Sequence, residues 1–125
     1  MAYKRKLEQD IRCPLEYGMS VFGGKWKSRI LCVLTDGPMR YSKLRSEMVD
    51  VTDAALASAL KDLENSGLIA RKQYEEIPPR VEYKLTEKGL TVIPILQNIC
   101  NWSGLYYNEV DEKASGKCQR CDFRG

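Results

Sequence analysis

The chain has 125 residues, of which 43% are hydrophobic and 30% are charged, and its formal net charge is +3. This length suits one domain with one hydrophobic core, and the composition is that of a globular protein rather than a disordered one. No apolar run approaches the roughly 20 residues that cross a bilayer. The basic N-terminus is not followed by the apolar stretch of a signal peptide. We therefore expect a cytoplasmic protein with no membrane partner.

The charges and the missing histidine restrict the function further. Residues 1–50 hold ten Lys or Arg against six Asp or Glu, whereas residues 51–125 hold ten against eleven, so the first part of the chain is the basic one. The chain has no histidine, the commonest general base and the commonest metal ligand. We therefore expect no enzyme and no cofactor.

The first predicted helix begins at Pro14 and ends near Phe22. Proline is favoured at the first helical position, and two glycines follow Phe22. Its apolar face consists of Leu15, Met19 and Phe22. We expect residues 1–12 to form a loose arm or a short helix before it.

A second helix is predicted from Lys25 to Thr35, where apolar residues recur at helical spacing before the breaker Asp36-Gly37-Pro38. A third, short helix follows around Tyr41, Leu44 and Met48. The loop of residues 49–51 then leads to a fourth helix, at about residues 52–65, with Thr52 or Asp50 as its cap. Two helices joined by a tight turn form the outline of a helix-turn-helix.

The apolar pattern becomes alternating after Gly67. Residues 68–74 and 81–85 are predicted as two strands, with residues 77–80 as a stiff turn between them. Prolines 78 and 79 suit such a turn better than a ladder position. A β-hairpin placed directly after the second helix of a helix-turn-helix is called a wing.

A last helix is predicted from Thr86 to about Val110, with Pro94 expected to kink it unless the helix starts late. Its apolar stripe is longer than one small domain needs, so we expect a homodimer. The predicted fold class is α+β, mainly α: a winged helix-turn-helix with a two-stranded β-hairpin wing and a terminal dimerisation helix. The domain spans residues 13–110, and residues 111–125 form a polar tail.

Side chains that could contact double-stranded DNA collect at helix starts and at the predicted hairpin tip. In a helix-turn-helix the second helix enters the major groove, and many of the hydrogen bonds go to phosphates. Arg80, at the tip, could enter a minor groove. The candidate DNA-binding residues are Lys25, Lys27, Arg40, Tyr41, Ser42, Lys43, Thr52, Ser58, Lys61 and Arg80. A single lysine of this kind is more often a solvated surface charge, and it is the collection of these residues at helix starts and at the hairpin tip that favours DNA binding.

Several short motifs together resemble the HxlR family of winged-helix regulators, relatives of the MarR type. The resemblance covers roughly residues 12–110. Its most specific motifs are Cys13-Pro14, Gly23-Gly24-Lys25-Trp26, Gly37-Pro38-Met39-Arg40-Tyr41, Leu63-Glu64 with Gly67-Leu68, and Pro78-Pro79-Arg80-Val81-Glu82-Tyr83. The resemblance implies a homodimeric DNA-binding repressor or activator with Arg80 on the wing.

The recognition helix departs from that family. Asp53-Ala54-Ala55-Leu56-Ala57-Ser58-Ala59 offers few groups that can form bidentate hydrogen bonds with a base. We therefore expect DNA shape and the wing to carry more of the sequence discrimination. The alternative is a winged-helix module that binds protein and has little sequence-specific affinity for DNA.

The five cysteines support three different interpretations. Cys13 stands at a helix N-terminus, where a thiolate is favoured; the family resemblance implies a sensor of oxidants or electrophiles there, and the alternative is a cap or core residue. Cys32 and Cys100 fall on apolar helical stretches and are expected to be buried. Cys118 and Cys121 form a lone CxxC, which is half a zinc site or an incidental, redox-labile pair. A thiol-disulfide oxidoreductase would need such a motif at a helix start near a βαβ pattern, whereas here it lies in the polar tail, so we do not expect that activity.

Overall fold

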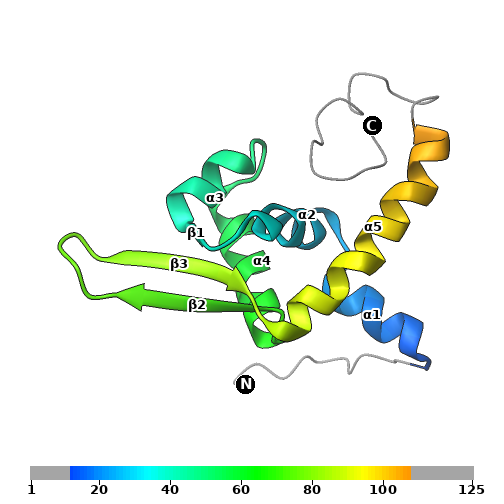
Figure 1. Cartoon of the computed structure of the whole chain (residues 1–125), viewed down its shortest axis with the longest axis horizontal. Helices are drawn as coiled ribbons and strands as arrows, with labels where there is room; N and C mark the ends of the chain where they lie inside the picture. The colour runs from blue at the N-terminus through cyan, green and yellow to red at the C-terminus, as the bar shows by residue number, and fades with distance from the viewer. Residues whose placement is uncertain (1–11, 108–125) are drawn as a thin grey trace.

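The computed structural model describes residues 12–107, and Figure 1 shows how their helices and strands are arranged. In chain order the elements are α1 (Pro14–Phe22), α2 (Lys25–Val33), the 3-10 helix η1 (Leu34–Asp36), β1 (Met39–Arg40), α3 (Tyr41–Glu47), α4 (Asp53–Asn65), β2 (Ile69–Tyr74), β3 (Arg80–Leu85) and α5 (Glu87–Tyr107). No helix within this range is long and apolar enough to span a membrane.

The helices occur where the sequence predicts them. Helix α1 has the predicted bounds, and α2 ends at Val33 because the chain tightens into η1 before Gly37. Helix α5 continues through Pro94 as one element. Since α3 and α4 are separated only by residues 48–52, the predicted helix-turn-helix is present.

The predicted two-stranded wing is present, and the sheet contains one further strand that the sequence does not predict. Strands β2 and β3 pair antiparallel, with Ile69 opposite Leu85 and Tyr74 opposite Arg80. The short strand β1 adds to the other edge of β3, with Met39 opposite Tyr83, so the sheet has three strands in the order β1-β3-β2. A strand of two residues has no measurable alternation, which is why the apolar pattern does not reveal it.

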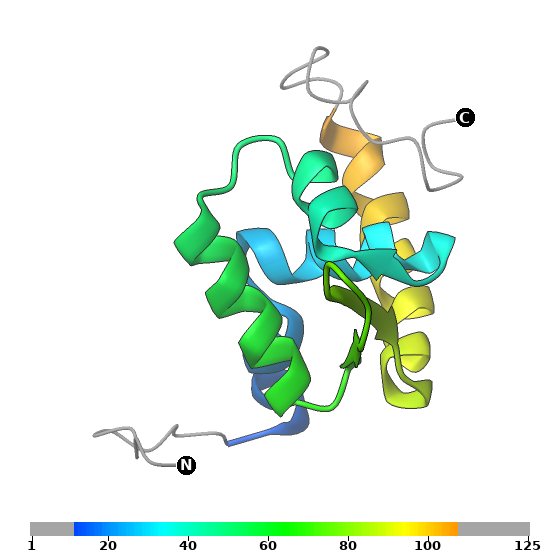
Figure 2. The same ribbon diagram turned by 90° about the vertical axis from the view of Figure 1, so that its left-hand side faces the viewer.

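One core joins the helices to the base of the sheet. Helix α2 contacts both α4 and α5. In Figure 2, α4 lies at one side of the molecule and α5 at the other, with α2 and the sheet between them. The largest fully buried side chains are Ile30, Leu31, Leu34, Leu44, Met48, Leu56, Leu63 and Leu68. Burying one such aliphatic side chain contributes about 1.5–3 kcal/mol, so this core anchors α4 firmly along one side.

The end of α4, the start of β2 and the start of α5 meet at one junction. Gly67 has φ of +80°, and its N–H and that of Leu68 donate to the carbonyls of Glu64 and Leu63, which closes α4 in a Schellman motif. The Thr86 N–H donates to the Leu68 carbonyl at 3.0 Å. A Cβ on Gly89 would lie only 2.1 Å from the Leu68 oxygen, so glycine permits this close approach.

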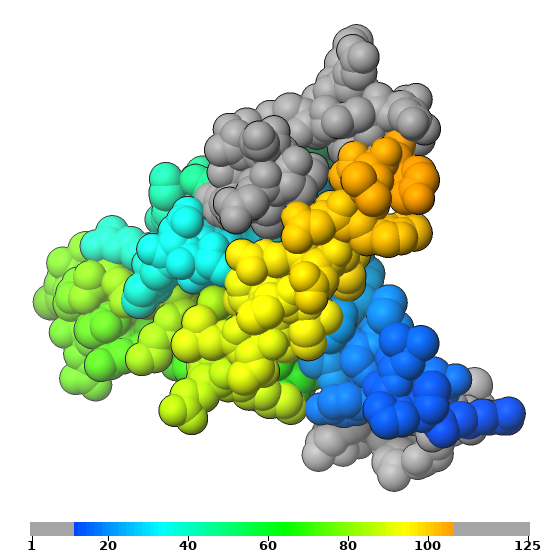
Figure 3. Space-filling view, turned by 45° about the vertical axis from the view of Figure 1, so that its right-hand side comes forward, coloured from blue at the N-terminus to red at the C-terminus, as the bar shows by residue number. Residues whose placement is uncertain are grey.

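Helices α1 and α5 leave large apolar side chains exposed. Figure 3 shows these two helices together on one face. The face of α1 that contains Leu15 and Met19 is not buried within the chain, since these residues are 70% and 53% exposed. The exposed large apolar residues of α5 are Leu90, Ile95, Ile99, Trp102, Leu105 and Tyr106. Large apolar residues exposed together on two helices, rather than scattered singly, are typical of an interaction surface.

Candidate nucleic-acid interface

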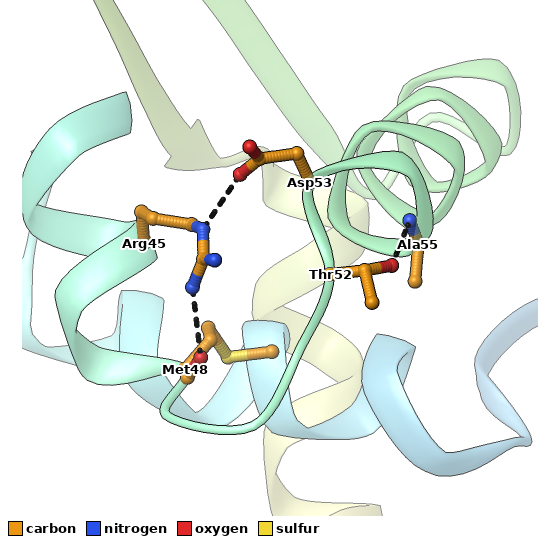
Figure 4. Close-up of polar contacts among 5 residues, drawn as sticks. All are labelled: Arg45, Met48, Thr52, Asp53 and Ala55. Atoms are coloured by element: carbon orange, nitrogen blue, oxygen red, sulfur yellow. Dashed lines mark hydrogen bonds and ion pairs between the residues drawn. The ribbon is translucent and has the colours of Figure 1, made fainter.

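Helix α4 is fixed at its N-terminus by a cap and by an ion pair to α3. The Thr52 hydroxyl accepts a hydrogen bond from the Ala55 N–H at 3.1 Å, so Thr52 is the cap and Asp50 is not. Arg45, near the end of α3, donates through Nε to Asp53 Oδ1 at 2.7 Å and through Nη1 to the Met48 carbonyl at 3.5 Å. Figure 4 shows Arg45 reaching across the turn between the two helices. One guanidinium thus contacts both ends of the turn.

The opposite side of α4 faces solvent. Its buried residues are Leu56, Ala59, Leu60 and Leu63. Ala54, Ala57, Ser58 and Lys61 are exposed and follow the spacing of a single helical face. The predicted candidates Ser58 and Lys61 therefore lie on an accessible surface, whereas Thr52 is exposed but uses its hydroxyl in the cap.

The predicted candidates before and at the start of α3 divide into exposed and half-buried groups. Arg40 in β1, with Ser42 and Lys43 in α3, is exposed. Lys43 forms an ion pair with Glu47 at 3.3 Å, one turn further along the helix. Tyr41 is half-buried and packs against the core, so its ring has a structural role in addition to any contact of its hydroxyl.

The two lysines at the start of α2 have different environments. Lys25 is exposed, and its Nζ lies 4.7 Å from the centre of the Trp26 ring. Arg29, on the next turn, stacks its guanidinium 5.2 Å from the same ring. Lys27 turns toward α1, where its Nζ donates to the Ser20 carbonyl at 2.9 Å. Lys27 therefore joins two helices, which the sequence alone does not indicate.

Arg80 is not at the tip of the hairpin, contrary to the sequence prediction. It opens β3 opposite Tyr74, and its guanidinium lies 4.0 Å from the centre of the Tyr74 ring. Its Nη atoms pair with Glu76 at 3.0 Å and Glu82 at 3.5 Å, which leaves the side chain 27% exposed. In the described part of the chain its Nε is buried without a hydrogen-bond partner. The tip itself is formed by residues 75–79.

Sequence reasoning missed three basic residues of this region. Arg45 is the link between α3 and α4 described above, and the only hint in the sequence is an arginine shortly before an acidic helix start. Arg71 and Lys72 are exposed on β2, and Lys72 Nζ lies 4.8 Å from the Tyr74 ring centre. The sequence signal for these two is the basic pair Arg71-Lys72 in the middle of the first predicted strand of the wing.

The cysteines of the described residues stand apart from this interface. Cys13 is the N-cap residue of α1; its side chain is exposed and makes no capping hydrogen bond. Cys32 and Cys100 are partly rather than fully buried. The CxxC of Cys118 and Cys121 lies outside the described residues. Residues 12–107 contain no group of three Cys, Asp or Glu side chains arranged to hold a metal ion.

Comparisons with known proteins point to transcriptional regulators. Residues 21–111 match the family model described as HxlR-like helix-turn-helix. An uncharacterized HTH-type transcriptional regulator of Methanothermobacter thermautotrophicus is 46% identical over 99 residues, which cover 79% of this chain and 76% of the relative. The solved structure of the redox regulator HypR in its oxidized form superposes with a TM-score of 0.69 and 35% identity, over 79% of this chain and 97% of HypR. The reduced form of the transcriptional regulator YodB from B. subtilis gives 0.70 and 31%, over 81% and 100%.

The cap of α4 yields a stability prediction. Replacing Thr52 by Ala should lower the free energy of unfolding by about 1 kcal/mol, because the Ala55 N–H loses its acceptor. Thr52→Ser keeps the hydroxyl and should cost much less. Urea unfolding of the two variants at one protein concentration measures the difference. Equal losses for Ser and Ala would show that the hydroxyl does not cap the helix.

Proposed function

The chain belongs to the HxlR-like helix-turn-helix family of DNA-binding transcriptional regulators. On this premise we propose that it binds DNA as a homodimer. Helix α4 lies in the major groove, and the β2–β3 wing lies in the adjacent minor groove. The observation that carries the proposal is the exposure of α4. This helix is buried along one side only, and the N-terminal half of its free side carries small side chains that allow close approach to base edges.

Phosphate contacts would come from the exposed basic residues around α4. Arg40 and Lys43 precede or begin α3, Lys61 lies on the free side of α4, and Lys25 begins α2. Ser42 can donate a hydroxyl in the same region. Such contacts fix the register of a protein on the duplex without reading its sequence. Lys27 is omitted from this set because its ammonium is bonded to α1.

Arg80 of the wing can bind DNA only if it first gives up an ion pair within the protein. Its guanidinium must exchange Glu76 or Glu82 for a DNA group, since both carboxylates hold it in the free protein. The exposed Arg71 and Lys72 of β2 need no such exchange. We therefore assign the wing three basic residues, of which Arg80 binds only after giving up an internal partner.

The homodimer rests on the apolar face of α1 and α5. The rings of Trp102 and Tyr106 contact each other in a tilted arrangement, with centroids 5.6 Å apart and planes at 52°, yet they are 66% and 55% exposed. Together with Leu105 they form a surface that a second copy can cover. A twofold dimer would present two copies of α4 to two half-sites of DNA.

A titration tests the DNA proposal. Purified protein is titrated against the DNA upstream of its own gene, at rising salt and with unrelated competitor DNA. We expect binding that survives competitor and weakens steeply with salt, because phosphate contacts release counterions. If the protein binds no DNA at low salt, the alternative of a protein-interaction module replaces this proposal; the exposed Ala54 and Ala57 are the observation that favours it.

In the same titration, Arg80→Ala should weaken binding and reduce the slope of log K against log salt by about 0.9, which corresponds to one phosphate contact. Arg80→Lys keeps the charge and should restore most of the slope. Unchanged affinity and slope in Arg80→Ala would mean that this arginine serves only the fold of the wing.

The dimer can be tested at one exposed position. Leu105 is 69% exposed, so Leu105→Lys should leave the fold of a protomer intact and shift the protein from dimer to monomer. Analytical ultracentrifugation measures the mass. Val49→Lys is the matched control, because Val49 is 76% exposed in the turn between α3 and α4, away from α5. Loss of the dimer in both variants, or in neither, contradicts the assignment of the interface to α5.

We further propose that Cys13 makes DNA binding sensitive to thiol-reactive compounds. Its thiol is exposed at the N-cap of α1, where reagents can reach it, and the similar HypR is a redox regulator. Alkylation by iodoacetamide, which releases iodide and a proton, should label Cys13 faster than the partly buried Cys32, as followed by mass spectrometry. DNA affinity should change on labelling in the native protein and not in Cys13→Ser. The same change in Cys13→Ser would assign it to another cysteine.

A further inference from the structure

The turn between α3 and α4 contains a charge arrangement that DNA binding alone does not explain. Asp53 is the first residue of α4, and its side chain is 81% exposed. A carboxylate at the start of a helix is stabilised by the helix dipole. At the start of a helix that enters a DNA groove, however, the same carboxylate repels the phosphates. Affinity for DNA therefore does not explain why an aspartate stands at this position.

The hydrogen bonds of Arg45 give Asp53 a structural role. Its Nε donates to Asp53 Oδ1 at 2.7 Å, a charge-assisted hydrogen bond, and Nη1 reaches the Met48 carbonyl at the end of α3. The residues between Met48 and Asp53 contain no helix and only one buried side chain, Val51. The Arg45 bridge is thus the polar connection described between α3 and the first turn of α4 (Figure 4).

We infer that Arg45 and Asp53 are positioning residues that set the angle at which α4 enters the major groove. The inference rests on the proposed function, because it assumes that α4 is the reading helix. Neither side chain has to touch a base. Asp53 accepts the hydrogen bond that fixes the helix start, and Arg45 cancels the charge that Asp53 brings to the DNA side.

The two roles of Asp53 predict opposite signs for Asp53→Ala. If the carboxylate only repelled DNA, its removal would tighten binding to every duplex. If Asp53 positions α4, its removal weakens binding to the selected sequence even though a negative charge has gone. Asp53→Asn separates the two, because an amide oxygen is neutral and can still accept the hydrogen bond from Arg45.

The experiment uses duplexes selected from a randomised pool by the unaltered protein, with unselected duplexes of the same length as the competitor. We expect Asp53→Ala to bind the selected duplex about fivefold more weakly, the upper range for a partly exposed pair. Its affinity for the unselected duplex should stay equal or rise. Asp53→Asn should bind both at least as tightly as the unaltered protein. Arg45→Ala should lose discrimination, and the double variant Arg45→Ala with Asp53→Ala should lose no more than Arg45→Ala alone.

The outcomes separate the inference from the proposal beneath it. Urea unfolding of each variant first establishes that all are folded at the assay temperature. Tighter binding of Asp53→Ala to the selected duplex, or additive losses in the double variant, overturns the positioning role and leaves DNA binding intact. Absence of any selectable duplex overturns the proposed function and this inference with it.

Discussion

The fold depends on the junction where α4 ends and α5 begins. The Thr86 hydroxyl donates to the Gly67 carbonyl at 2.6 Å and accepts from the Gly89 N–H at 3.0 Å. This one side chain therefore bonds the backbone just after α4 and caps the start of α5. The backbone of Thr86 adds a hydrogen bond to Leu68. Because the wing starts from the same residues, the orientations of α4, the wing and α5 are fixed together rather than one by one.

The same junction connects the exposed apolar face of α1 and α5 to α4. Lys88, in the first turn of α5, donates through Nζ to the Tyr17 hydroxyl of α1 at 3.1 Å and to the Ser66 carbonyl at the end of α4 at 2.8 Å. Lys88 thereby links α1 to the end of α4 through one side chain. The exposed apolar face of α1 and α5 is thus connected directly to the end of α4.

The sequence predicted the helices and the wing because each has a local signal. Proline at the start of α1, threonine at the cap of α4 and glycine at its end act within a few residues of their own positions. The resemblance to a known family added the expectation of a homodimeric DNA-binding regulator. The strand β1 could not be predicted because it forms only where β3, distant in the chain, lies beside it. The partners of Lys27, Arg45 and Arg80 are close in the sequence, but which carbonyl or carboxylate a long, flexible side chain reaches depends on how the neighbouring elements are oriented.

Those contacts change how the charge of the protein should be understood. Lys43, Arg45 and Arg80 each form an ion pair with a carboxylate of the same chain, so the candidate interface is closer to neutral than a count of its basic residues suggests. A phosphate must compete with these internal partners, and each exchange returns only the difference between two ion pairs. For the proposed binding mode we therefore expect limited affinity for arbitrary DNA. Discrimination would then depend on whether a sequence lets α4 and the wing bind together, so the geometry of the α3–α4 turn would matter more than net charge.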